Sequence, residues 1–273
     1  IPRTLALTIY GDLDISIIDA MPMGRKPIIT EVVLPNKRKQ VYEHINNELK
    51  AGRQAYVICP RISEPDPDKE NQLNVKSVKS EAERLSNHEL KGWNIGILHS
   101  KVSQAEKEST MKEFAAHEID VLVATSVVEV GVNVPNATNI IIEGGERFGL
   151  SQLHQLRGRV GRGSAESSCV LLYQAPLGKT AQKRLEALCN STDGFEISNI
   201  DLELRGPGEV LGTKQTGDVR LRMASLLRDQ HWLPLVQEVA KQIVAHEPDK
   251  VIALTRRWLQ QPGGDTAIRF FQS

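Results

Sequence analysis

The sequence predicts an α/β fold in which a parallel sheet flanked by helices is followed by an α-helical C-terminal module with a helical hairpin. Two observations predict it. Up to about residue 175, six short apolar runs rich in β-branched residues alternate with helical patterns. From there onward the strand signals stop and helical patterns follow one another. Strands that alternate with helices are typical of a parallel sheet, because each crossover lays a helix on one of its faces.

Each predicted strand is a short apolar run of the kind that fits burial on both faces of a sheet. The runs are IITEVVL at 28–34, AYVIC at 55–59, IGIL at 95–98, VLVA at 121–124, III at 140–142 and CVLLY at 169–173. The helical patterns between them cover 36–51, 78–91, 103–116 and 150–159. The segment PRISEPDPDKENQ at 60–72 has three prolines and no apolar period, which predicts a solvated loop.

The C-terminal part has helical patterns only. They cover 179–191, 195–204, 220–227, 232–246 and 249–259. The stretch RGPGEVLGTKQTG at 205–217 is rich in glycine, which predicts two helices that meet at a tight turn or hook. The predicted division of the chain is therefore 1–27, 28–175 and 176–273.

Composition restricts the class of protein. The net charge is +0, with 34 basic and 34 acidic residues, so any argument for an anionic partner must be local. Aromatic residues are 4%, which argues against base-stacking platforms for single strands. The three cysteines are far apart and join no Cys/His cluster, so no metal site or disulfide framework is predicted. This cysteine usage makes a reduced, cytoplasmic compartment the expectation. No signal peptide is seen and no apolar stretch reaches about 18 residues, so we expect no membrane span.

The chain contains no complete ATP-binding loop. Such a loop needs GxxxxGK[ST], in which backbone amides wrap the phosphates. Gly178-Lys179-Thr180 matches only the end of that pattern, since Tyr173 stands where the first glycine belongs. We expect this triplet to begin a helix instead. No DExH or DEAD box follows a strand either, so no magnesium carboxylate is predicted.

A cluster of arginine and glycine stands out at 152–163, QLHQLRGRVGRG. On a helix of about 100° per residue, Gln155, Arg159 and Arg162 fall on one face. Gly158 and Gly161 fall together on another side, where the missing side chains permit close packing. An arginine fork donates two parallel hydrogen bonds to a phosphate and stays charged. The spacing therefore predicts a phosphate-binding face.

The cluster QLRGRVGR resembles motif VI of the superfamily 2 helicases, and three other segments resemble further motifs in family order. Motif V is matched by VLVATSVVEVGVNVPNA at 121–137, motif IVa by GILHSKVS at 96–103, and motif IV by QAYVICPRI at 54–62. The start of the chain, 1–28, and FEISNIDLELRGPGEVLGTKQTG at 195–217 are similar to the RecG branch, the latter to its translocation motif. The resemblance implies a RecA-like second motor domain and a helical translocation module.

The same resemblance implies what a full member has and this sequence does not show. It implies a first motor domain with the ATP-binding loop and DExH box, and a wedge domain for branched DNA. The sequence begins IPRTL without methionine, so we expect it to be part of a longer protein. ATP with Mg²⁺ would then be bound mainly by the first motor domain.

The resemblance also assigns roles to residues. Arg159 and Arg162 would act as arginine fingers on the ATP, ordered by Gln155, and Gly131 and Asn133 of motif V would lie at the same site. DNA phosphates would be contacted from motifs IV, IVa and V. The residues concerned are Arg61, His99, Ser100, Lys101, Thr125 and Ser126. Coupling to translocation would use Arg205, Gly206, Gly208, Glu209 and Gln215. Two roles stay open for Arg157, a salt bridge and a contact with the DNA backbone.

The predicted function is therefore the C-terminal motor part of an ATP-dependent double-stranded DNA translocase that remodels forks and Holliday junctions in recombination and repair. The chain alone should not hydrolyse ATP. Two alternatives stay open at this point. One is the motor of a transcription-repair coupling factor, which shares the translocation motif. The other is a non-enzymatic module that binds DNA or protein.

Overall fold

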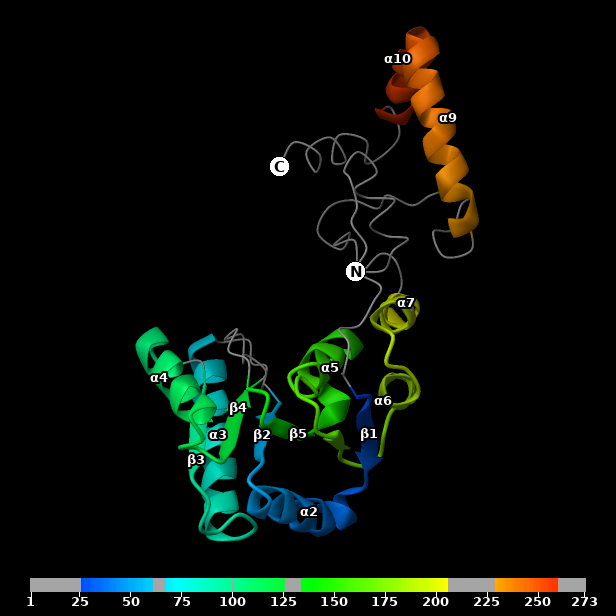
Figure 1. The fold of residues 1–273 in the computed structure, drawn as a ribbon. Coiled ribbons are helices and arrows are strands. Elements are labelled where there is room, and N and C mark those ends of the chain that lie inside the picture. The colour runs from blue at the N-terminus through cyan, green and yellow to red at the C-terminus, as the bar shows by residue number, and fades with distance from the viewer. Residues whose placement is uncertain (1–25, 61–66, 100, 126–133, 206–228, 260–273) are drawn as a thin grey trace. The chain divides into compact units, whose positions relative to one another are not determined.

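A computed structural model describes residues 26–60, 67–99, 101–125, 134–205 and 229–259. Its sheet has six strands, all paired in parallel, in the order β1-β6-β5-β2-β4-β3 (Figure 1). The strands are β1 Ile28–Val33, β2 Gln54–Cys59, β3 Ile95–Leu98, β4 Val121–Thr125, β5 Ala137–Ile142 and β6 Ser167–Leu172. Each of the six predicted strands is confirmed, and with them the α/β class.

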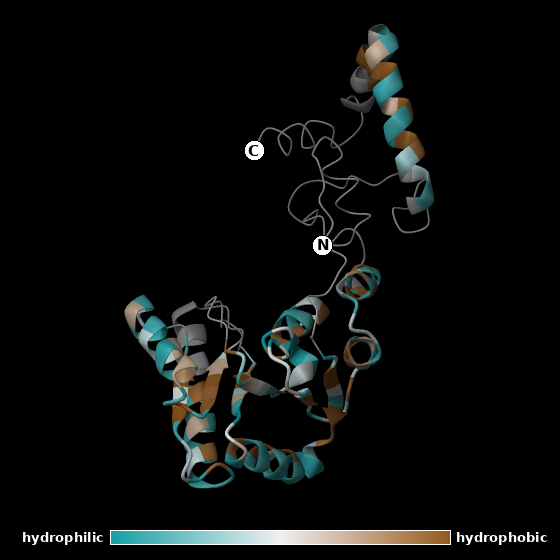
Figure 2. Cartoon of the chain, viewed as in Figure 1, coloured by the Kyte–Doolittle hydropathy of each residue, from teal (hydrophilic) through white to brown (hydrophobic). Residues whose placement is uncertain are grey.

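Helices cover both faces of this sheet. The helices of this part are α2 Arg38–Lys50, α3 Pro67–Asn87, α4 Gln104–Ala115 and α5 Leu150–Arg157. Alternate β2 side chains, Ala55, Val57 and Cys59, join a buried cluster with α2 and α3. Tyr56 points to the other face, where its ring meets Phe114 of α4 edge-on at 5.0 Å. Figure 2 shows the apolar strands at the centre, with hydrophilic residues on the outer helices.

The predicted solvated loop at 60–72 is wrong for its second half, because α3 already begins at Pro67. Proline is well suited to a first helical position, where its missing N–H has no intrahelical partner and its fixed φ matches the helix. The acidic residues that follow it suit a first turn, since negative charge near the N-terminus of a helix interacts favourably with the positive end of the helix dipole. Pro67 therefore starts a helix in a segment where the prolines predicted a loop.

Further helices follow the sheet: α6 Lys179–Asn190 and α7 Gly194–Arg205. Gly178 is the N-cap of α6, so the Gly-Lys-Thr triplet begins a helix as predicted. The last pair is α9 Leu233–His246, preceded by a 3-10 turn, and α10 Pro248–Leu259, which pack on each other. The predicted helix 220–227 lies outside the described residues. No helix in the described ranges is long and apolar enough to span a membrane.

The chain divides into two compact units, of which residues 20–197 form the larger. This unit contains the sheet and α2–α6, and within it α6 packs against β1. The predicted domain limits at 27/28 and 175/176 stay a prediction.

Candidate functional site

The strands that lead into the predicted DNA-contacting motifs end side by side. Strand β4 lies between β2 and β3, with Cys59 opposite Thr125 and Leu98 opposite Ala124. Because all three strands are parallel, the segments that follow them start at one edge of the sheet. Ligands of open α/β sheets usually bind at this carboxyl edge. The topology therefore brings the strand ends that lead into the predicted motifs IV, IVa and V to one edge.

Three of the residues predicted to contact DNA fall within the described ranges. Lys101 is exposed, His99 is half-buried, and Thr125 is only 3% exposed at the end of β4. Arg61, Ser100 and Ser126 lie outside the described residues, as do Gly131 and Asn133. Of the predicted translocation residues, Arg205 ends α7. The other four, Gly206, Gly208, Glu209 and Gln215, also lie outside.

The helix α5 is shorter than predicted, and this changes the geometry of the arginine cluster. It ends at Arg157, with Gly158 as its C-cap, whereas the prediction extended it to 159. The N–H of Arg159 then donates to the carbonyl of Leu156, and that of Val160 to Arg157, in a tight final turn. Gly161 adopts φ +73°, which no right-handed helix allows. The prediction that Gln155, Arg159 and Arg162 share one helical face is therefore wrong.

The charges of Arg159 and Arg162 nevertheless both influence one residue, Tyr56 of β2. Burial raises the pKa of Tyr56 to about 12, and the positive charges of Arg162 and Arg159 partly oppose this rise. The charges of both guanidinium groups therefore act on one side chain of β2. Neither arginine forms an ion pair within the described part of the chain, although Nε of Arg162 donates to the carbonyl of Gly158. Two cations without a carboxylate partner suit an external anion such as a polyphosphate.

Arg157 has neither of its two expected roles. It is 3% exposed, and its Nη1 donates to the carbonyls of Leu188 and Ser191 at 2.7 and 2.8 Å. Its Nη2 lies 3.1 Å from Nδ1 of His154. Burial lowers the pKa of Arg157, and the main-chain carbonyls are the partners that keep the buried fork satisfied. Arg157 therefore ties α5 to the C-terminal end of α6.

The sequence did contain a signal for this burial. Leu150, Leu153 and Arg157 are spaced i, i+3, i+7, which is the spacing of a buried helical face. The prediction considered the charge of Arg157 and not its position on this buried helical face, and so it missed the structural role.

Gly161 is required by both its backbone and its surroundings. A Cβ built on it would lie 2.8 Å from Cγ1 of Ile28, and its φ of +73° is strained for any side chain. Gly158 differs, since its φ is −66° and the nearest atoms to a Cβ are at 3.5 Å. The two glycines therefore do not share the packing side that the helical pattern predicted.

Replacing Gly161 by alanine is expected to lower the free energy of unfolding by about 2 kcal/mol, because a left-handed backbone costs an L-residue about 1–2 kcal/mol and Ile28 must also shift. Gly158→Ala is the matched control. It should be neutral or stabilise by about 0.5 kcal/mol, since its backbone is already helical. Urea unfolding of both variants measures the difference, and equal stabilities would contradict this account of the turn.

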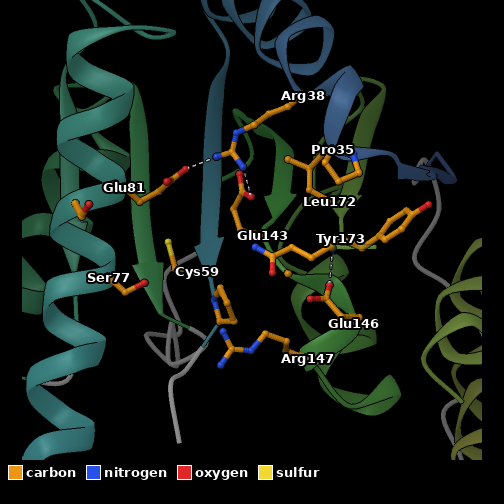
Figure 3. A pocket seen from close by; sticks show the side chains of 14 residues that line it. Pro35, Arg38, Cys59, Ser77, Glu81, Glu143, Glu146, Arg147, Leu172 and Tyr173 are labelled. Atoms are coloured by element: carbon orange, nitrogen blue, oxygen red, sulfur yellow. Dashed lines mark hydrogen bonds and ion pairs between the residues drawn. The ribbon is translucent and has the colours of Figure 1, made fainter. Parts of the chain in front are cut away.

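A pocket of 410 Å³ opens where β2, β5 and β6 end (Figure 3). Arg38 of α2 bridges two carboxylates there, Glu81 of α3 and Glu143 after β5, each at 2.6 Å. The hydroxyl of Tyr42 donates to Glu143 at 3.0 Å, and the guanidinium of Arg38 lies 5.4 Å from the Tyr42 ring centre. Burial raises the pKa of Glu143 despite the opposing charge of Arg38.

This polar network was not predicted. Its three charged residues are separated by 43 and 105 positions in sequence, and only the fold joins them. One signal was present, since Glu143 directly follows a fully buried strand. Arg38 pairs with both carboxylates, and Arg84 pairs with Glu81 as a second cation. Because the charges are balanced in this way, the pocket offers little net attraction to an ion, and we assign it a structural role.

Two family models match the chain. The helicase conserved C-terminal domain matches residues 36–164, and the C-terminal part of domain 3 of the ATP-dependent DNA helicase RecG matches residues 191–258. The first match contains strands β2 to β5 of the sheet and the arginine cluster, and it leaves out β1 and β6. The second begins at Ser191, whose carbonyl accepts a hydrogen bond from Arg157, and it includes α7, α9 and α10 up to residue 258.

Curated relatives agree with these matches. An ATP-dependent DNA helicase RecG of Haemophilus influenzae is 51% identical over 260 residues, which is 95% of this chain and 37% of that protein. The RecG of Escherichia coli strain K12 is 47% identical over 262 residues, 96% of this chain and 37% of that protein. The chain thus spans little more than a third of the length of the relatives it matches.

A solved structure described as RecG bound to a three-way DNA junction has the same fold. It is 43% identical in sequence, with a TM-score of 0.67, over 85% of this chain and 29% of that one. In sequence and in fold the chain is of the RecG type. It corresponds to the C-terminal part of the proteins of this family, which are named ATP-dependent DNA helicases.

Proposed function

We propose that the chain is the second motor domain and helical module of an ATP-dependent helicase that moves along double-stranded DNA and remodels forks and Holliday junctions. The observation that carries the proposal is the pair Arg159 and Arg162, which follow α5 in one short turn and have no carboxylate partner in the described residues. Arginine forks of this kind neutralise charge that develops on a γ-phosphate during transfer.

The sequence of the chain contains no complete ATP-binding loop and no DExH box, so these arginines form only part of an ATPase site. In the proposal, ATP with Mg²⁺ is bound mainly by a first motor domain elsewhere in the protein. Arg159 and Arg162 would reach its γ-phosphate when the two motor domains close, and Gln155, which is exposed on α5, would help to order them. Gly131 and Asn133 of motif V would line the same interface.

DNA would lie along the carboxyl edge of the sheet, with phosphates contacted from the ends of β2, β3 and β4. Contacts of this kind position a duplex without reading its bases. The solved relative is described as bound to a three-way DNA junction, which supports branched DNA as the partner. The match to the RecG domain 3 model favours this function over that of a transcription-repair coupling factor.

The chain alone is expected to hydrolyse no ATP above background, with or without branched DNA, because it has the arginines without the phosphate-binding loop. It should still bind a three-way junction, with an affinity that falls steeply as salt rises. A coupled ATPase assay and fluorescence anisotropy measure the two. Hydrolysis that survives Arg162→Ala would refute the assigned role, and absence of DNA binding at low salt would refute the DNA part.

A further inference from the structure

The corner between α6 and α7 is fixed by hydrogen bonds centred on Ser191, which is buried. The N–H of Ser191 donates to the carbonyl of Ala187 at the end of α6. Its hydroxyl donates to Oε2 of Glu196 and accepts the N–H of Asp193 at 3.1 Å. Oδ1 of Asp193 in turn accepts the N–H of Phe195 at 2.7 Å, as an N-cap does at the start of a helix. Ser191 therefore connects the last turn of α6 to the first turn of α7.

Helix α5 reaches this corner with two side chains. Nη1 of Arg157 donates to the carbonyls of Leu188 and Ser191, so the guanidinium is bonded to the residue at the centre of the corner. His154 lies against the first residue of α7, since a Cβ built on Gly194 would be only 3.1 Å from its Nε2. Figure 1 shows α5 beside α6, and the two helices pack on each other. All these residues belong to the compact unit 20–197.

The two side chains of α5 also hold each other. Nη2 of Arg157 lies 3.1 Å from Nδ1 of His154. A guanidinium only donates hydrogen bonds, so Nδ1 is the acceptor and the neutral ring carries its proton on Nε2. Burial lowers the pKa of His154 and the charge of Arg157 lowers it further, while Asp193 opposes the shift. The imidazole therefore has a fixed orientation between Arg157 and the start of α7.

The bond from Arg157 to Ser191 joins parts of the chain that match different family models. Arg157 lies within the helicase conserved C-terminal domain, whose match ends at residue 164. Ser191 is the first residue that matches the RecG domain 3 model. The general helicase part is thus bonded to the RecG-type part at this corner.

The turn that carries Arg159 and Arg162 starts at Arg157. Arg157 is the last residue of α5, and its carbonyl accepts the N–H of Val160. A movement of the two arginines toward a phosphate would therefore displace Arg157 as well. Its fork cannot slip freely along α6, because that would leave a buried charge and two buried carbonyls without partners. The displacement would be passed to Ser191.

We propose that Arg157, His154 and the hydrogen bond from Ser191 to Glu196 are positioning elements that couple the arginine turn to the helical module. Movement of α5 on ATP would reach the first turn of α7 through them. The inference rests on the proposed function and extends it, since the residues predicted for coupling begin at Arg205, the last residue of α7. Helix α7 is continuous from Gly194 to Arg205, so a tilt of its first turn is carried to its end.

The test uses the full-length protein and measures two rates in one reaction, ATP hydrolysis and unwinding of a three-way DNA junction. Ser191→Ala and Glu196→Ala remove the link to α7 and leave the carbonyl that Arg157 binds in place. In both variants the amount of DNA unwound per ATP should fall about three- to tenfold, while ATP turnover stays within about twofold. Ser109→Ala is the matched control, because it removes a hydroxyl bonded to Glu113 on α4, away from the corner. It should change neither rate.

Two further variants test whether the residues act together. Glu196→Gln keeps an acceptor for the Ser191 hydroxyl and should restore most of the unwinding per ATP that Glu196→Ala loses. Arg157→Lys keeps the charge but has no fork to serve the two carbonyls and His154 at once, so it should also lower unwinding per ATP. Combined with Ser191→Ala it should be no worse than the weaker single variant, because both substitutions break one path.

The outcomes separate the inference from the function on which it rests. If the unsubstituted protein hydrolyses ATP and unwinds the junction but Ser191→Ala and Glu196→Ala behave like Ser109→Ala, the coupling role is wrong and the proposed function stands. The same holds if both rates fall in equal proportion, or if the effects of Arg157→Lys and Ser191→Ala multiply, since the corner then only stabilises the fold. If the unsubstituted protein neither hydrolyses ATP nor unwinds the junction, the proposed function itself fails.

Discussion

Replacing Arg159 or Arg162 by alanine in the full-length protein is expected to lower the rate of ATP turnover by about 10³-fold or more, with nucleotide binding largely unchanged. Both residues follow α5 on a short turn, and the charges of both act on the pKa of Tyr56. An arginine that meets the γ-phosphate only as charge develops stabilises the transition state more than bound ATP. Its loss should therefore reduce kcat much more than it changes the KM.

Arg53→Ala provides a matched control for these variants. Arg53 precedes β2, at the opposite edge of the sheet, and pairs with Glu48. Its removal deletes an arginine of the same domain without touching the proposed site, so turnover should stay within about twofold of the unsubstituted protein. Steady-state hydrolysis with saturating DNA, together with binding of a fluorescent nucleotide, measures both properties. Unchanged turnover in both finger variants would remove the finger role from this cluster.

The sheet could be predicted from sequence because each of its inner strands is buried on both faces. A strand such as β4, with all five residues buried, is an uninterrupted apolar run and needs no long-range information to be recognised. The residues at the carboxyl edge of the sheet could be predicted from the same pattern, since the carboxyl ends of parallel strands lie at one edge. The residues that start there, including His99 and Lys101, could therefore be placed at one edge before the fold was known.

The turn after α5 could not be placed by periodicity alone. In the sequence, the 3.6-residue pattern continues through Arg159 and Arg162. In the structure, Gly158 caps the helix and Gly161 turns the chain with a positive φ. Glycine just past the last periodic residue is a helix stop signal, and here it outweighs the spacing of the arginines. The turn itself is fixed by the positive φ of Gly161 and by its close approach to Ile28.

Replacing Arg38 by methionine is expected to lower the free energy of unfolding by about 3 kcal/mol. The guanidinium bridges Glu81 and Glu143, which are only 18% and 13% exposed. Its loss leaves Glu143 without a cationic partner in a poorly solvated pocket, beside Glu81, which still pairs with Arg84. Lys39→Ala, in the same helix, removes an exposed pair with Glu43 at 3.9 Å and should cost less than about 0.5 kcal/mol. Urea unfolding at neutral pH measures both.

The dependence on pH identifies the cause of the loss. In the unsubstituted chain burial already raises the pKa of Glu143, and Arg38 opposes that rise, so removing Arg38 raises this pKa further. A carboxyl whose pKa is higher in the folded than in the unfolded chain gains a proton on folding, and stability then increases as pH falls. The deficit of Arg38→Met should therefore be largest near about pH 8 and shrink toward about pH 5. It should also be smaller in a Glu143→Gln background, where one of the two charges is absent. A deficit that is the same at both pH values and in both backgrounds would mean that Arg38 stabilises the chain through packing on Tyr42 instead of through charge.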